Sequence, residues 1–265
     1  MSVPPLTWLY VPADRPDRVE KAIASRAHAV IVDLEDGVAP AAKDEARANL
    51  ADLLGPRREK PMYVRVNAGS TADLEAVAQL QIAGVIVPKV ERPEDIPPDL
   101  EVQVLIESPL GLENAFAIAS HPQVQGISLG EADLRSQTGA LEVGLDWARG
   151  RIVNAAVAAG LPRPPQSVYP HVRDAEGLAR SCRRGRVLGH LGRSAIHPDQ
   201  LQVIEEAYLP TKAEVDQARA TVEKLKEAGV GTLADGDFVD AAMLGAAHQV
   251  LELAARYGVA GQTSK

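Results

Sequence analysis

Three carboxylates stand within four positions in the segment IVDLEDGVAP, residues 31–40: Asp33, Glu35 and Asp36. They follow an apolar run and precede a glycine. Carboxylates this close repel one another unless a cation or a basic side chain offsets their charge. The segment therefore predicts a charged site, and the other polar residues that end apolar runs indicate its chemistry.

Those other residues are Arg65 and Asn67, Lys89, Glu107, Glu131 and Asp133, and His197. Oxygen ligands without cysteine or paired histidines at metal-binding spacing suit Mg²⁺, with Mn²⁺ as an alternative, and disfavour zinc. Because Mg²⁺ takes only one or two protein carboxylates, we assign Glu107 and Asp133 as direct ligands. Glu35 and Asp36 are then expected to hold waters around the metal. The alternative is that Asp36 caps a helix and Glu131 faces solvent.

Two basic residues belong to the same set. Arg65 lies in the apolar run MYVRV, and its planar guanidinium matches a carboxylate in two-point contact. Its partner is a substrate carboxylate, one of the acids above, or both. Lys89 suggests a Schiff-base nucleophile, but neighbouring acids would keep its pKa high, so we expect an ion pair instead.

Eight short apolar runs alternate with helical segments, which indicates parallel βαβ units. The runs are residues 7–11, 29–34, 62–66, 84–90, 102–107, 126–130, 167–170 and 192–198. The pattern predicts an α/β fold, a TIM (β/α)8 barrel with a C-terminal helical extension. The barrel core is expected at 1–200, and 201–265 as a helical extension of the same domain that packs on a neighbouring subunit. In such barrels the carboxyl ends of the strands meet at one rim, which would bring the polar residues together.

Composition limits the classes of partner. A net charge of -8 and a pI near 5.3 argue against a nucleic-acid-binding surface, and the basic group at residues 180–186 is expected to be a solvated helix end. No run approaches 18 apolar residues, and the N-terminal residues lack the pattern of a signal peptide, so we expect no membrane association. The single cysteine, Cys182, fits a reducing compartment. These features predict a cytoplasmic enzyme.

The motifs, taken in order, resemble those of the citrate lyase β-subunit-like proteins of the HpcH/HpaI aldolase superfamily, which includes malyl-CoA and citramalyl-CoA lyases. The matching segments are WLYVPADRPDRVEKA, VIVDLEDGVAPAAKDEAR, YVRVN, VPKVE, LIESPLGLENA, ISLGEADL, AIHPDQL and GDFVDAAMLGAA. The chain departs from the usual pattern at Ala13 and Asp14, and at PPQSVYP before the seventh run. These departures leave the acyl thioester undetermined.

The resemblance implies a Mg²⁺-dependent oxo-acid lyase that breaks a carbon-carbon bond. Its substrate would be a citryl-, malyl- or citramalyl-type β-hydroxyacyl thioester, and its products a keto acid (oxaloacetate, glyoxylate or pyruvate) and an acetyl thioester. By the resemblance, Glu107 and Asp133 match the metal ligands, and Arg65 matches the residue that binds the keto-acid carboxylate. The turn with Gly130, Ala132 and Asp133 would offer backbone N–H groups to that carboxylate. Asp240 matches an acidic residue that in some relatives reaches a neighbouring subunit's site. It also implies a homo-oligomer, with a trimer favoured, and CoA rather than an acyl carrier protein.

For the chemistry, a rim carboxylate such as Glu35 or Asp36, or a hydroxide held by the metal, is expected to take the hydroxyl proton. Asp240 is expected to exchange a proton with the acetyl carbon. Two alternatives stay open. One is a pyruvate-type metal-dependent aldolase that uses no thioester. The other is a citrate lyase subunit that works only in a complex with an acyl carrier protein.

Overall fold

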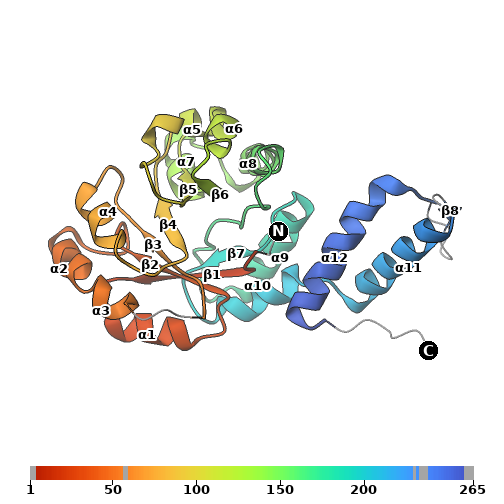
Figure 1. The fold of residues 1–265 in the computed structure, drawn as a ribbon, viewed down its shortest axis with the longest axis horizontal. Coiled ribbons are helices and arrows are strands. Elements are labelled where there is room, and N and C mark those ends of the chain that lie inside the picture. Colours follow the sequence, from red (N-terminus) through yellow and green to blue (C-terminus); the bar gives the residue numbers. More distant parts are fainter. Residues whose placement is uncertain (1–3, 56–58, 229–230, 233–237, 260–265) are drawn as a thin grey trace. The chain divides into compact units, whose positions relative to one another are not determined.

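The computed structural model describes residues 4–55, 59–228, 231–232 and 238–259 (Figure 1). They form two compact units, one spanning Pro4–Ala207 and one that starts at Tyr208. In the first unit seven described strands make one parallel sheet in the order β6-β5-β4-β3-β2-β1-β7. The strands are β1 Thr7–Pro12, β2 Ala29–Asp33, β3 Met62–Arg65, β4 Gly84–Val87, β5 Val102–Ile106, β6 Val124–Leu129 and β7 Arg193–Ala195.

Helices follow the strands and bring the chain back for the next parallel pairing. They are α1 Pro16–Ala24, η1 Pro40–Ala42, α2 Lys43–Ala48, α3 Leu50–Leu54, α4 Thr71–Val77, η2 Pro93–Asp95, α5 Pro109–Glu113, α6 Ala115–Ala119, α7 Glu131–Thr138, η3 Glu142–Leu145, α8 Asp146–Ala158, α9 Ala175–Val187 and α10 Gln200–Tyr208. The predicted TIM-barrel class is confirmed by this arrangement.

The seventh apolar run, residues 167–170, does not form the predicted strand. Gln166 makes an isolated parallel bridge with Arg193, and the Ser167 hydroxyl donates to the Leu129 carbonyl at the end of β6. Pro164 and Pro165 precede this segment and Pro170 ends it, and prolines lack the N–H groups that a ladder requires. The segment between β7 and β6 is therefore joined to them by one backbone bridge and by side-chain hydrogen bonds from Ser167 and Arg193.

The interior of the sheet explains why the strand ends are polar. An apolar cluster of Trp8, Ala29, Ile31, Ile86 and Leu105 fills the inside, with Tyr10 and Tyr63 packed against it. Side chains on a strand alternate between faces, so residues two positions further along point the same way. Two positions beyond Ile31, Tyr63 and Leu105 stand Asp33, Arg65 and Glu107. The barrel interior thus changes from apolar to charged at the carboxyl end of the strands.

The second unit contains α11 Lys212–Ala228 and α12 Leu244–Tyr257, which pack against each other. Between them lie the short strands β8 Gly231–Thr232 and β9 Phe238–Val239, paired antiparallel, and the helical turn η4 Ala241–Met243. The contact of this extension with a neighbouring subunit stays a prediction. Among the helices that the structure describes, none is both long and apolar enough to cross a lipid bilayer.

Candidate active site

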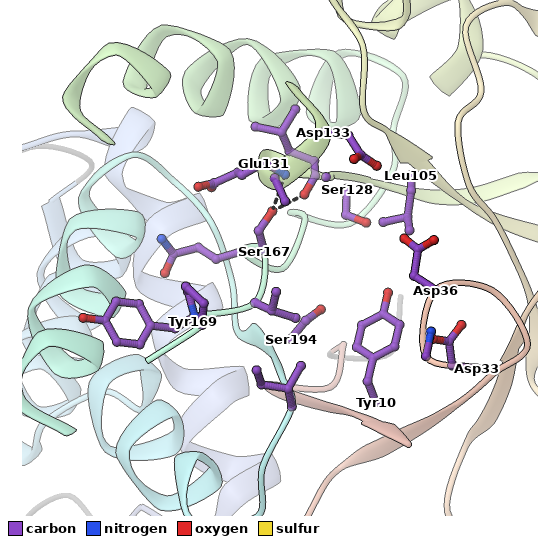
Figure 2. A pocket seen from close by; sticks show the side chains of 18 of the residues that line it. Tyr10, Asp33, Asp36, Leu105, Ser128, Glu131, Asp133, Ser167, Tyr169 and Ser194 are labelled. Carbon is purple, nitrogen blue, oxygen red and sulfur yellow. Dashed lines mark hydrogen bonds between the residues drawn. The ribbon is translucent and has the colours of Figure 1, made fainter. Parts of the chain in front are cut away.

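The carboxyl ends of the strands border a cavity of about 550 Å³ within the first unit (Figure 2). Of the residues predicted from the sequence, it is lined by Asp36, Arg65, Glu107, Gly130, Ala132 and Asp133. Glu35 does not line it, and Asp240 lies in the other unit. The structure therefore brings most of the predicted residues to one cavity, although some of them, such as Asp36 and Asp133, are far apart in the chain.

Asp33 and Arg65 form a buried ion pair on the cavity wall. They are direct neighbours in the register of β2 and β3. Arg65 Nε donates to Asp33 Oδ1 at 2.7 Å, and Nη2 donates to Oδ2 at 2.6 Å. The Asp33 carboxylate also accepts the backbone N–H groups of Glu35 and Gly37. Burial acts to lower the pKa of Arg65, but the hydrogen bonds and charge of Asp33 outweigh it, so the guanidinium stays charged.

Glu35 turns away from the cavity and joins two cations. Its Oε1 lies 2.6 Å from Lys89 Nζ, and its Oε2 lies 2.8 Å from Arg65 Nη1, an ionic contact without hydrogen-bond geometry. Burial raises the pKa of the Glu35 carboxyl, while Lys89 and Arg65 act to lower it. The hydrogen bond to Glu35 raises the pKa of Lys89, which makes a neutral, nucleophilic amine unfavourable. Lys89 thus forms the expected ion pair.

Asp36 and Tyr10 face the open part of the cavity. Asp36 is exposed, and its nearest cation is Lys89 at 3.9 Å. The Tyr10 ring lies under the Arg65 guanidinium at 5.0 Å, and Figure 2 shows its hydroxyl directed into the cavity. Burial raises the pKa of Tyr10, so the phenol stays protonated, and its hydroxyl can donate or accept a hydrogen bond. Asp36 rather than Glu35 can therefore reach a bound molecule.

Glu107 and Asp133 come from neighbouring segments, the end of β5 and the first turn of α7. Glu107 is 6% exposed, and its Oε2 accepts the backbone N–H of Lys89 at 3.0 Å. Lys89 reaches this position with φ of 57°, a conformation that a lysine rarely adopts. Burial, Glu35 and Asp133 together raise the pKa of Glu107 to about 7. The two acids are thus close enough for their charges to interact.

The start of α7 contributes backbone groups to the cavity. Gly130 precedes the helix, and the cavity is lined by Gly130 and by the next three residues, 131–133. The first N–H groups of a helix lack partners within it and carry a partial positive charge. The Gly130 N–H already donates to the Ile106 carbonyl and the Glu131 N–H to the Ser167 hydroxyl, so the predicted donor role of Gly130 is wrong. The N–H groups of Ala132 and Asp133 are the ones that can donate hydrogen bonds to a carboxylate of a bound molecule.

The donor set fits Mg²⁺. Glu107 is desolvated beside two other acids, an arrangement that a divalent cation stabilises. Within the part of the chain that the structure describes, no group of three or more His, Cys, Asp or Glu side chains has metal-binding geometry. Two carboxylates completed by water are a common protein contribution to a Mg²⁺ site. Glu107 and Asp133 can supply them.

Two residues of the cavity, Asp33 and Tyr10, have roles that the sequence does not predict. Asp33 was recognised as one of three acids, but its bidentate pairing with Arg65 depends on the register of β2 and β3. Tyr10 carries no signal in a single sequence, because its place above the core follows from strand order. His197, noted at the last strand, is exposed and does not line the cavity.

Gly130 is required because a side chain there would collide with Glu107. A Cβ at this position would overlap the Glu107 carboxylate and its Cγ. We expect Gly130→Ala to displace that carboxylate and lower Mg²⁺ affinity at least about tenfold, measured by isothermal titration calorimetry. The control is Gly150→Ala in α8, where a Cβ meets nothing within 4 Å. Equal Mg²⁺ affinity in both variants would contradict the placement of Glu107 as a ligand.

The pKa of Glu107 predicts a pH-dependent metal affinity. Below about 7 this carboxyl is mostly protonated in the metal-free protein, and a cation must displace the proton. Mg²⁺ affinity should therefore fall as pH drops from 7 to 5.5 and stay level above pH 8. Calorimetry in two buffers of different ionisation enthalpy should detect proton release at pH 6.5 and almost none at pH 8.5. Affinity that is constant across this range would refute the prediction.

The chain is similar to known proteins over most of its length. Residues 6–198 match the protein family described as HpcH/HpaI aldolase/citrate lyase. The chain is 34% identical over 267 residues to a (3S)-malyl-CoA thioesterase of Cereibacter sphaeroides, with 92% of each chain covered. It is 30% identical over 297 residues to an L-malyl-CoA/beta-methylmalyl-CoA lyase of the same species, with 93% of each covered.

The chain is also similar to a protein of known structure. The CitE protein of Mycobacterium tuberculosis, in complex with magnesium, acetoacetate and coenzyme A, superposes with a TM-score of 0.84 and 33% identity. The match covers 96% of this chain and 98% of that one. The family predicted from the motifs is confirmed by these likenesses: this chain belongs to the HpcH/HpaI aldolase/citrate lyase family.

Proposed function

We propose that this protein is a Mg²⁺-dependent carbon-carbon lyase that cleaves a β-hydroxyacyl-CoA thioester to a keto acid and acetyl-CoA. The observation that carries the proposal is the pair of acids Glu107 and Asp133 on the same cavity as the Arg65 guanidinium. A metal and a guanidinium together recognise a small molecule with a carboxylate beside a hydroxyl or keto oxygen. Citryl-, malyl- and citramalyl-type esters have this chemistry, and the relatives named above support it.

The side chains divide the work of cleavage. When bound through Glu107 and Asp133, Mg²⁺ would polarise the hydroxyl and carboxylate oxygens of the substrate. Arg65 uses hydrogens that Asp33 and Glu35 leave free to hold the same carboxylate, and the N–H groups of Ala132 and Asp133 donate to it. The two-point contact with the buried Asp33 carboxylate holds the Arg65 guanidinium in place.

Asp36 is the proposed base, because of the two predicted rim acids it alone lines the cavity. It takes the hydroxyl proton, the carbon-carbon bond breaks, and the electron pair passes to the α-carbon of the acetyl thioester as an enolate. That carbon then takes a proton, which completes the keto acid and acetyl-CoA. We propose Asp240 of a neighbouring subunit as the acid, in a homo-oligomer. In this chain Asp240 caps η4, accepting the Ala242 N–H at 2.9 Å.

A second candidate is hydrolysis of the thioester, supported by the likeness to a malyl-CoA thioesterase. The two reactions differ in their products. A lyase releases a keto acid and acetyl-CoA without a free thiol, whereas a thioesterase releases the hydroxy acid and free CoA thiol.

One assay separates these functions. Malyl-CoA, citramalyl-CoA and citryl-CoA are incubated with the protein and Mg²⁺, and keto acid and free thiol are both measured. We expect keto acid in proportion to acetyl-CoA, with no thiol and no turnover in excess EDTA. Thiol without keto acid supports the thioesterase instead. Inactivity with every CoA ester, but activity with esters of an acyl carrier protein, would point to a citrate lyase subunit.

A further inference from the structure

Arg149, on α8, is the most buried arginine of a charged network behind the cavity. It is 1% exposed and does not line the cavity itself. Its Nη2 donates to Glu142 Oε1 at 2.7 Å, and its Nη1 donates to Asp146 Oδ1 at 3.0 Å. Nη1 also donates to the Glu142 carbonyl at 3.3 Å, and the guanidinium contacts Glu131 as well. A buried arginine with several acids is costly to desolvate, so its position calls for a reason beyond stability.

The contact with Glu131 has two points. Arg149 Nε donates to Glu131 Oε1 at 2.9 Å, and Nη2 donates to Oε2 at 2.5 Å. Paired, parallel hydrogen bonds of this kind fix the orientation of a carboxylate as well as its position. Because Glu131 is the first residue of α7, the pairing fixes the start of that helix against α8.

The same turn is held at its backbone. The Glu131 N–H donates to the Ser167 hydroxyl at 3.3 Å, and the Gly130 N–H donates to the Ile106 carbonyl at 2.9 Å. Three contacts thus surround the four residues 130–133, and only the one from Arg149 acts through a charged side chain.

This turn carries one proposed metal ligand and touches the other. Asp133 is its last residue, and Gly130 lies so close to Glu107 that no side chain fits between them. Figure 2 shows the Glu131 and Asp133 side chains leaving the start of α7 in different directions, and both residues line the cavity, so Glu131 can pair with Arg149 on one side while Asp133 stays free for the metal on the other. A shift of the turn would therefore move Asp133 and press on Glu107 together.

We propose that Arg149 is a positioning residue: through its two-point contact with Glu131 it sets the distance and orientation between Asp133 and Glu107 for Mg²⁺. The inference rests on the proposed function, in which these two acids hold the metal. Displacements of about 1 Å in such a constellation cost up to roughly 100-fold in rate. Arg149 acts on the metal site without touching it.

Three variants test the role. Arg149→Lys keeps the charge but cannot form the two parallel hydrogen bonds. Glu131→Gln removes the charge of the partner on α7 at constant size. The matched control is Asp146→Asn, which removes an acid from the same arginine but on α8 itself. Mg²⁺ affinity is measured by calorimetry with oxaloacetate present, beside the melting temperature.

We expect Arg149→Lys and Glu131→Gln to lower Mg²⁺ affinity about tenfold, because residues that orient metal ligands typically have effects of this size. Asp146→Asn should change the affinity less than about twofold. Melting temperatures should not follow this order. Equal affinities in all three variants, or affinity losses that follow the loss of thermal stability, would overturn the inference.

A second measurement separates this inference from the proposed function. If the wild-type protein binds no Mg²⁺, the proposed function fails, and amide hydrogen exchange of residues 132–134 in the metal-free protein decides the positioning role. Exchange should be faster in Glu131→Gln than in Asp146→Asn by about tenfold if Arg149 holds the turn. Equal exchange would overturn it.

Discussion

Asp133→Ala should abolish Mg²⁺-dependent turnover while the barrel stays folded. Asp133 lines the cavity from the first turn of α7, and its carboxylate is one of two proposed metal ligands. Without it Glu107 alone faces the cation, and at least about a 100-fold loss in kcat/KM is expected together with the loss of calorimetric Mg²⁺ binding. The assay is release of keto acid from the ester that the wild-type protein cleaves best.

The fold is checked in the same sample. Asp133 is only partly buried, and its side chain makes no hydrogen bond or ion pair with the other residues that the structure describes, so circular dichroism and melting temperature should change little. Asp52→Asn, on an exposed face of α3, removes the same charge far along the chain and should keep full activity. Full activity in Asp133→Ala would refute the assignment of the metal site.

Asp33→Asn should produce the largest loss of stability among the site variants. Asp33 is 4% exposed and accepts four hydrogen bonds, two from Arg65 and two from backbone N–H groups. Removing one partner of a buried ion pair costs roughly 3–5 kcal/mol, and here Arg65 would keep only its ionic contact with Glu35. We expect the melting temperature to fall by on the order of 10 °C. Chemical denaturation provides the free energy of unfolding.

The origin of that loss can be isolated. Asp33→Asn combined with Arg65→Met removes both charges, and the double variant should be more stable than the sum of the single losses predicts, by about 1 kcal/mol or more. The control is Asp17→Asn, which breaks the exposed pair with Arg15 and should cost less than about 1 kcal/mol. Strictly additive losses at positions 33 and 65 would contradict a coupled buried pair.

The strands and their polar ends were predictable because their signals are local. Short apolar runs with helices between them predict parallel units, and seven of the eight runs form strands in the structure. An acid at the end of an apolar run, such as Glu107, can be identified from the amino-acid sequence alone. The prediction of a strand at 167–170 was wrong because nearby prolines lack the N–H groups that a strand donates to its neighbour. The neighbouring strands lie far along the chain, so the missing hydrogen bonds are not visible in the local pattern.

The roles of the acids at positions 33, 35 and 36 were not predictable from their spacing. Side chains two positions apart on a strand share a face, which placed Asp33 with the interior, but the turn after β2 decides the rest. It directs Glu35 to Lys89 and Arg65 and leaves Asp36 exposed on the cavity. The basic side chain with which each acid pairs depends on the position of residues from other strands.

By itself the sequence determined the barrel class, the family and the set of polar residues at the strand ends, because strand period, motif order and residue chemistry are properties of short segments. The tertiary structure alone decided which of those residues meet. It paired Asp33 with Arg65 across β2 and β3, brought the start of α7 against Glu107, and placed Arg149 behind it. Electrostatic energy depends on distance in space and on burial, and neither is encoded in separation along the chain.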